Sequence, residues 1–125
     1  MATTNFTTEI DAELDRLAML PSNWDTQGAL PLAPEIIDAA RRFVASLPAD
    51  LIIPPSVVPM AKGNLQFEWN EGSRSLELEF ESPTTIHFLK WHPEEGVEEE
   101  GLISTSDVAR AAALIRSFRR SASNV

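Results

Sequence analysis

Hydrophobic residues recur at intervals of three or four positions in the N-terminal part of the chain. Ile10, Leu14 and Leu17 are spaced in this way, and a helix with 3.6 residues per turn brings such positions onto one face. We therefore expect a helix that begins near Thr8. A second apolar stripe, bounded by two prolines, predicts another helix over residues 34–47.

The period changes to two in the middle of the chain. Apolar and polar residues alternate over 65–69 and again over 76–81, which is typical of half-buried strands. If residues 71–74 close a hairpin between these runs, Phe67 lies opposite Leu78 and the apolar face is continuous. The pattern therefore predicts an antiparallel pair with one buried face.

Two further strands and a helix are expected after this hairpin. Residues 84–91 are apolar on both faces, which suits a central or helix-covered strand, and a short fourth strand is expected near 99–103. Residues 108–118 carry one apolar stripe and predict a last helix. The predicted fold class is α+β, with two N-terminal helices, an antiparallel meander of three to four strands, and a C-terminal helix packed on one face of the sheet.

Length and composition fit one packed domain. The chain has 125 residues, of which 43% are hydrophobic, so we expect a single α+β domain spanning residues 1–125. It has no cysteine, which excludes a disulfide framework, a thiolate metal site and a cysteine nucleophile. The N-terminus has no secretory pattern, and no apolar run is long enough to cross a bilayer. We expect a cytoplasmic protein that does not contact membranes.

The charge balance favours a basic protein partner. The formal net charge is −9 and the isoelectric point is about 4.6, which argues against direct binding to the phosphates of nucleic acids. The last helix is the exception, because it contains Arg110, Arg116, Arg119 and Arg120. The negative C-terminal end of that helix, or the acidic sheet, explains these arginines better than a nucleic-acid patch does.

Motifs of enzymes are missing from the sequence. There is no phosphate-binding glycine loop, no nucleophile elbow and no H-E-x-x-H zinc motif. A metal site would have to combine His87 and His92 with carboxylates such as Glu94 and Glu95. The two histidines are an odd number of residues apart and face opposite ways on one strand. We predict no catalytic residue, no metal site and no cofactor, and keep a small enzyme of unknown type only as an alternative.

Acidic side chains share the polar face of the predicted hairpin. They are Glu68, Glu77, Glu79 and Glu81, and the acidic segment 94–100 follows. The register sets Glu68 opposite Glu77, and such a pairing of like charges costs stability. One interpretation is a solvated face that discourages aggregation. The other is a binding face for a cationic partner.

Two motifs carry a resemblance to a known group of proteins. Residues 20–29 read LPSNWDTQGA, and residues 59–69 read PMAKGNLQFEW. These resemble the L-P-x-N-W-D-x-x-G-A and P-x-x-x-G-x-(I/L)-x-(L/F)-E-W motifs of a widespread family of small bacterial proteins of uncharacterised function. The resemblance covers most of the chain, although Ser82 and Pro83 stand where the family often has a D-G turn. It implies the fold and a bacterial origin, mildly favours a defence-associated role, and carries no catalytic residues.

The tryptophan of the first motif has two interpretations. Trp24 can anchor the loop between the first two helices, with Asx turns beside it and a positive φ at Gly28. Alternatively, Trp24 and Trp69 flank Glu68 in a partly open pocket that suits an arginine or lysine of a partner.

These observations predict a non-catalytic acidic module of the antitoxin, immunity or inhibitor type, which covers a basic surface of a partner protein. The alternative is a nucleic-acid mimic, of the anti-restriction or anti-CRISPR type, which blocks a DNA- or RNA-binding protein. A mimic needs a row of carboxylates with the phosphate repeat, whereas a local plug needs one cluster around an apolar anchor. The predicted partner-binding residues are Glu68, Glu77, Glu79, Glu81, Trp24 and Trp69.

Overall fold

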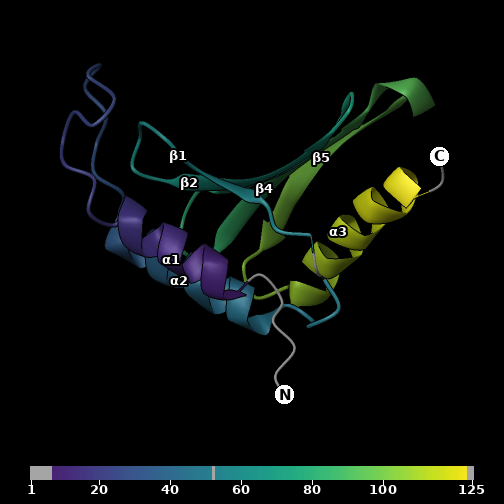
Figure 1. Ribbon diagram of the computed structural model, residues 1–125, viewed down its shortest axis with the longest axis horizontal. Coiled ribbons are helices and arrows are strands. Elements are labelled where there is room, and N and C mark those ends of the chain that lie inside the picture. The colour runs from purple at the N-terminus through teal and green to yellow at the C-terminus, as the bar shows by residue number, and fades with distance from the viewer. Residues whose placement is uncertain (1–6, 52, 124–125) are drawn as a thin grey trace.

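The computed structural model describes residues 7–51 and 53–123, with side chains as far as Phe118. The helices and strands follow the chain as α1 (Thr7–Leu17), α2 (Pro34–Ser46), β1 (Ser56–Pro59), β2 (Leu65–Glu71), β3 (Arg74–Phe80), β4 (Thr85–His92), the short 3-10 helix η1 (Pro93–Glu95), β5 (Val97–Ser104) and α3 (Val108–Ser123) (Figure 1). The predicted α+β class is confirmed, because two helices precede an antiparallel sheet and the C-terminal helix contacts it.

The sheet is a meander in which each strand pairs antiparallel with the next, in the order β1-β2-β3-β4-β5. The predicted register of the central hairpin is confirmed, since Phe67 lies opposite Leu78. The connecting turn is shorter than expected, because Glu71 pairs with Arg74 and leaves two residues between them. Gly72 makes this turn possible, since it adopts a positive φ of 61°.

The strand count differs from the prediction of three to four, because the proline-rich segment before β2 also forms a strand. β1 pairs Val57 with Phe67 and ends at Pro59, opposite Leu65. Proline has no N–H to donate, so it is tolerated at the edge of a sheet but not in its centre. The four residues of β1 are too few for an alternating pattern to be recognised. The prolines around it also argue against a strand when only the sequence is considered.

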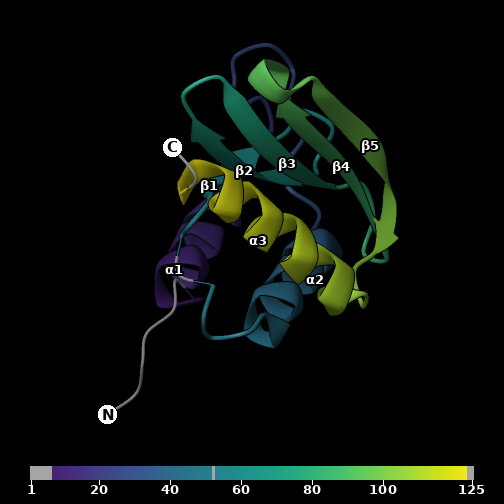
Figure 2. The ribbon, with the colours of Figure 1, turned by 90° about the vertical axis from the view of Figure 1, so that its right-hand side faces the viewer.

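All three helices pack on one side of the sheet, as Figures 1 and 2 both show. Phe43 of α2 contacts Phe67 and Phe80 of the sheet, with ring centroids 6.3 and 5.4 Å apart. These three rings and their aliphatic neighbours form one buried core. In the part of the chain that the structure describes, no helix covers the opposite side of the sheet.

This one-sided packing decides the environment of β4, whose residues are apolar on both faces. Ile86 and Phe88 face the helices and are buried. Leu89 and Trp91 alternate with them and face the other way, and Trp91 is 46% exposed. The expected central position is correct, since β4 lies between β3 and β5, but only one of its faces is covered by helices.

Candidate binding face of the sheet

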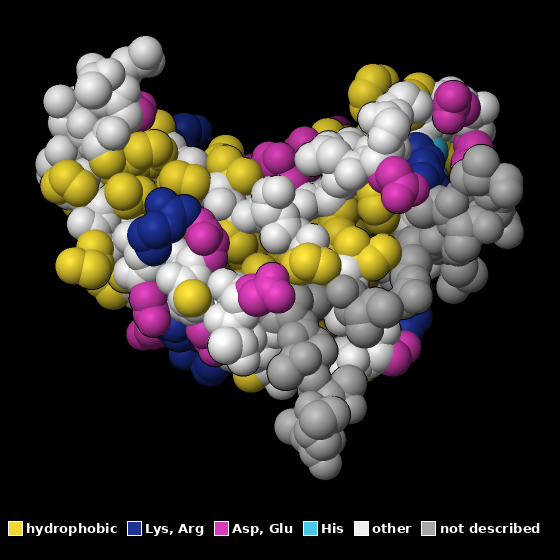
Figure 3. Space-filling model, viewed as in Figure 1, with side chains coloured by type: hydrophobic (Ala, Val, Ile, Leu, Met, Phe, Trp, Pro, Cys, Tyr) yellow, Lys and Arg dark blue, Asp and Glu magenta, His cyan; other side chains and the backbone are white. Residues whose placement is uncertain are grey.

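The side of the sheet that faces away from the helices is here called the outer face. Residues two apart on a strand share a face, so the pairing of the strands defines its members. Its central side chains are Gln66, Glu68, Glu77, Glu79, His87, Leu89, Trp91, Glu98, Glu100 and Leu102. Figure 3 shows that the molecule is hollowed here, between the loop that follows α1 and the β4–β5 hairpin, with acidic side chains along the floor.

Like charges lie side by side on the outer face. Glu68 lies directly opposite Glu77 on the neighbouring strand, as predicted, and Glu79 is two residues from Glu77 on the same strand. Burial raises the pKa of Glu77 above its ordinary value, and the charges of Glu68 and Glu79 raise it further, whereas His87 opposes the shift. The cluster is thus partly desolvated and self-repelling.

No lysine or arginine in the described ranges, 7–51 and 53–118 with side chains, forms an ion pair with this cluster. Two buried amides hold its carboxylates instead. Gln66 Nε2 donates to Glu68 Oε2, and Asn64 Nδ2 donates to Glu79 Oε2 at 2.6 Å. Both amide side chains are 8% exposed. The carboxylates are therefore oriented, but their charge is not neutralised.

An apolar patch adjoins the acidic cluster. Leu102 is 63% exposed and Trp91 is 46% exposed, and the half-buried Leu89 lies beside Glu77 across the strands. Exposed apolar side chains beside charged ones are typical of protein-binding surfaces. The sequence signal for this patch was the apolar pattern of 84–91 on both faces, which we interpreted as a central or helix-covered strand.

The acidic segment 94–100 contributes less to this face than the sequence suggested. Glu98 and Glu100 lie on the outer face, but Glu99 pairs with Lys90 and faces the helices' side of the sheet. Glu94 and Glu95 belong to η1 at the end of the β4–β5 hairpin. The alternation of strand residues therefore divides the glutamate run between two faces.

The pocket predicted from Trp24, Trp69 and Glu68 does not form as expected, because Glu68 and Trp69 line one pocket with Ile53 and Phe118 and Trp24 does not join them. Trp69 is 2% exposed and faces the helices, where its Nε1 donates to Ile53 O at 2.9 Å. Adjacent residues of a strand point to opposite faces, so the Trp69 ring and the Glu68 carboxylate do not share a face of the sheet. Trp69 is a core residue, and Trp91, which the prediction omitted, is the tryptophan exposed on the outer face.

Trp24 belongs to a loop that the first motif holds together. Asn23 Oδ1 accepts a hydrogen bond from the amide of Gly28 at 2.6 Å, and Asp25 Oδ1 accepts from two further amides at 2.8 and 3.0 Å. Trp24 is half-buried, and its Nε1 donates to Leu30 O at 2.8 Å. Gly28 has a φ of 90°, which glycine adopts without strain.

These bonds support the structural interpretation of the motif. The amides of Gln27 and Ala29 stabilise the charged carboxylate and lower the pKa of Asp25. The loop is held to the turn between β1 and β2, where Leu30 N donates to Ala61 O at 2.9 Å. Contact between Trp24 and a partner stays a prediction.

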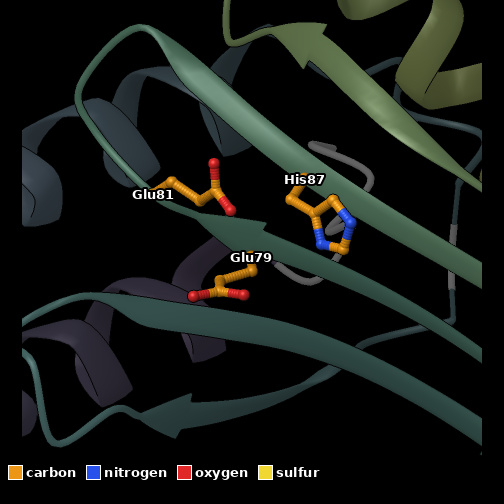
Figure 4. A group of neighbouring side chains, drawn as sticks. All are labelled: Glu79, Glu81 and His87. Atoms are coloured by element: carbon orange, nitrogen blue, oxygen red, sulfur yellow. The ribbon is translucent and has the colours of Figure 1, made fainter.

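The two histidines lie on opposite sides of the sheet, as their spacing predicts. His92 is 1% exposed and packs against Phe118 of α3. His87 lies on the outer face opposite Glu79, and its ring comes close to the carboxylates of Glu79 and Glu81 (Figure 4). The candidate metal site considered from the sequence combined His87 only with His92, Glu94 and Glu95, whereas the structure brings His87 close to Glu79 and Glu81. The sequence feature that precedes this arrangement is Glu79-x-Glu81, which the short β3–β4 turn separates from His87.

No protein-family model, curated protein or solved structure matches this chain. Among the residues that the structure describes, no helix combines the length and the apolar character that crossing a membrane requires.

Proposed function

We propose that this protein is a non-catalytic acidic binding module, of the antitoxin, immunity or inhibitor type, and that its outer face covers a basic surface of a partner protein. The observation that carries the proposal is the juxtaposition of Glu68, Glu77 and Glu79, which no described cation neutralises, with the exposed Trp91 and Leu102.

Two features favour binding over a merely solvated surface. A face that only prevents aggregation gains nothing from an exposed tryptophan and leucine, because apolar groups promote association. The opposed pair Glu68 and Glu77 also costs stability in the isolated protein. A lysine or arginine from a partner relieves this repulsion, while Trp91 supplies an apolar anchor beside the charges.

The distribution of charge favours a local plug over an extended nucleic-acid mimic. The carboxylates lie on neighbouring strands around one apolar patch, and the longest series on a single strand is Glu77, Glu79 and the adjoining Glu81. The revised contact set keeps these three residues and Glu68. It replaces Trp69 by Trp91, since Trp69 is buried.

The test begins with affinity purification of the partner from the native host, followed by binding kinetics with the purified proteins. Glu77→Lys combined with Glu79→Lys reverses two charges on the outer face and leaves the apolar side chains of the core unchanged. We expect association to slow by about tenfold or more at low salt, and its dependence on salt to weaken, because exposed charges steer the encounter.

The matched control combines Glu35→Lys with Asp38→Lys, which reverses the same number of charges at exposed positions of α2. This control should bind like the wild type. Equal affinity and equal salt dependence for the outer-face variant would show that the acidic face only confers solubility. Displacement of DNA or RNA from the partner by the wild type would instead favour the mimic.

A further inference from the structure

Three side chains at one end of the outer face converge in a way that protein binding does not require. The carboxylates of Glu79 and Glu81 and a ring nitrogen of His87 all lie within 4.8 Å of one another (Figure 4). Ligands bonded at about 2.0–2.2 Å to one ion lie at most about 4.4 Å apart, so the three atoms must approach one another slightly to hold an ion. We propose that these three residues bind a divalent first-row transition metal ion, with Zn²⁺ as the representative.

The backbone brings these ligands together at the short turn between β3 and β4, which several hydrogen bonds stabilise. Glu79 pairs with His87 across β3 and β4, and Glu81 follows two residues later on the same side. The amide of Glu81 donates to Thr85 O at 3.0 Å, and Ser82 Oγ accepts from the amide of Thr85 at 3.1 Å. The positions of the three ligands are therefore set by the hairpin itself.

A carboxylate on the far side orients the imidazole. His87 Nε2 lies 2.9 Å from Glu100 Oε2, and Figure 4 shows the other ring nitrogen on the side of Glu79. A hydrogen bond to Glu100 places the proton on Nε2 and leaves the lone pair of Nδ1 free for a metal. Metal-binding histidines usually make such a hydrogen bond through their second nitrogen.

A buried amide supports the second ligand. Asn64 is 8% exposed, and its Nδ2 donates to Glu79 Oε2 at 2.6 Å, so the other oxygen of Glu79 is free to coordinate. Among the described residues, no donor reaches the buried Oδ1 of Asn64.

The donor set selects the class of ion. An imidazole nitrogen favours Zn²⁺ and its transition-metal neighbours over Mg²⁺ and Ca²⁺, which prefer oxygen ligands alone. Three protein ligands leave at least one position for water. This inference does not rest on the proposed function, because the ion binds the isolated chain and no partner is needed.

In the test, Zn²⁺ is titrated into the chelator-treated full chain. Calorimetry measures the heat of binding, and NMR measures the ¹⁵N chemical shifts of the histidine rings. We expect one ion per chain and a shift of Nδ1 of His87. His92, the other of the two histidines in the sequence, is an internal control and should not shift. Mg²⁺ or Ca²⁺ at the same concentration should leave the His87 signals unchanged.

Variants distinguish a specific metal site from general attraction of the cation to the negative charge of the outer face. Glu81→Gln and His87→Gln should each weaken Zn²⁺ binding by about tenfold or more, and Glu100→Gln by about tenfold through its effect on the imidazole. Glu68→Gln is the matched control, since it removes one charge from the same face, and it should change the affinity by less than about threefold.

The proposal is overturned if millimolar Zn²⁺ leaves His87 unchanged, or if Glu68→Gln weakens binding as much as Glu81→Gln does. Partner binding measured in the presence of a chelator reports on the proposed function separately. Loss of metal binding with intact partner binding, or the reverse, shows which of the two proposals has failed.

Discussion

The two faces of the sheet are built from the same strands but have opposite properties. On the side of the helices, Phe67, Leu78 and Phe80 are fully buried and the aromatic rings contact one another. On the outer face, Glu77 lies beside another glutamate, and Trp91 is 46% exposed. Neighbouring residues of one strand therefore belong either to a tightly packed core or to a surface whose negative charges have no counter-charge.

This difference separates the residues that stabilise the fold from those that do not. On the inner face, Phe67 and Phe80 pack on each other, and Phe43 of α2 completes the aromatic cluster. The outer face retains opposed carboxylates and exposed apolar groups, both of which would be easy to replace in a surface that serves only to stay in water. The contrast is the main structural argument for a binding role.

The largest expected effect comes from truncating one aromatic residue on each face. Phe67→Ala should lower the free energy of unfolding by about 3–5 kcal/mol, because it leaves a cavity in the core. Trp91→Ala should lower it by only about 1–2 kcal/mol, since about half of this side chain is exposed. Urea denaturation measures both. A loss above about 2 kcal/mol for Trp91→Ala would mean that the outer face is already covered, for example by a second copy of the chain.

A smaller effect is expected where the inner face approaches its edge. Gly101 of β5 lies opposite Phe88, and a Cβ at this position would meet the ring at 3.0 Å. Gly101→Ala should therefore displace the ring and cost about 1–3 kcal/mol. Leu102→Ala, one residue later on the outer face, is the control and should be nearly neutral in thermal unfolding. Equal costs for the two variants would contradict the assignment of the faces.

The smallest effect is a gain in stability on the outer face. The pKa of Glu77 is raised in the folded chain, so ionisation of this carboxyl destabilises the fold as the pH rises above the unfolded value. Glu77→Gln should then stabilise the protein by about 0.5 kcal/mol at pH 7, and the gain should vanish below about pH 4, where the carboxyl is protonated in both states.

Chemical denaturation at several pH values follows this change. Glu94→Gln, in the exposed η1 turn, is the matched control and should show no comparable gain. A destabilising Glu77→Gln would mean that the carboxylate makes a favourable interaction, and the repulsion on the outer face would have to be abandoned.

The sequence by itself determined the helices, the core and the register of the central hairpin. These features follow from the local periodicity of the sequence. Leu14 and Leu17 share a face of a helix, and Phe67 and Leu78 share a face of the sheet. The same rule places Trp69 and Glu68 on opposite faces. The error in the predicted pocket therefore came from setting that rule aside, not from missing information.

The tertiary structure alone decided which surface is left open and which side chains meet there. Residues 84–91 are apolar on both faces, so their pattern could not show that all three helices pack on one side and leave Trp91 exposed. The convergence of His87 with Glu79 and Glu81 likewise depends on the length of the β3–β4 turn. Periodicity assigns residues to faces, but coverage of a face and contacts across a turn depend on long-range packing, which the local pattern does not encode.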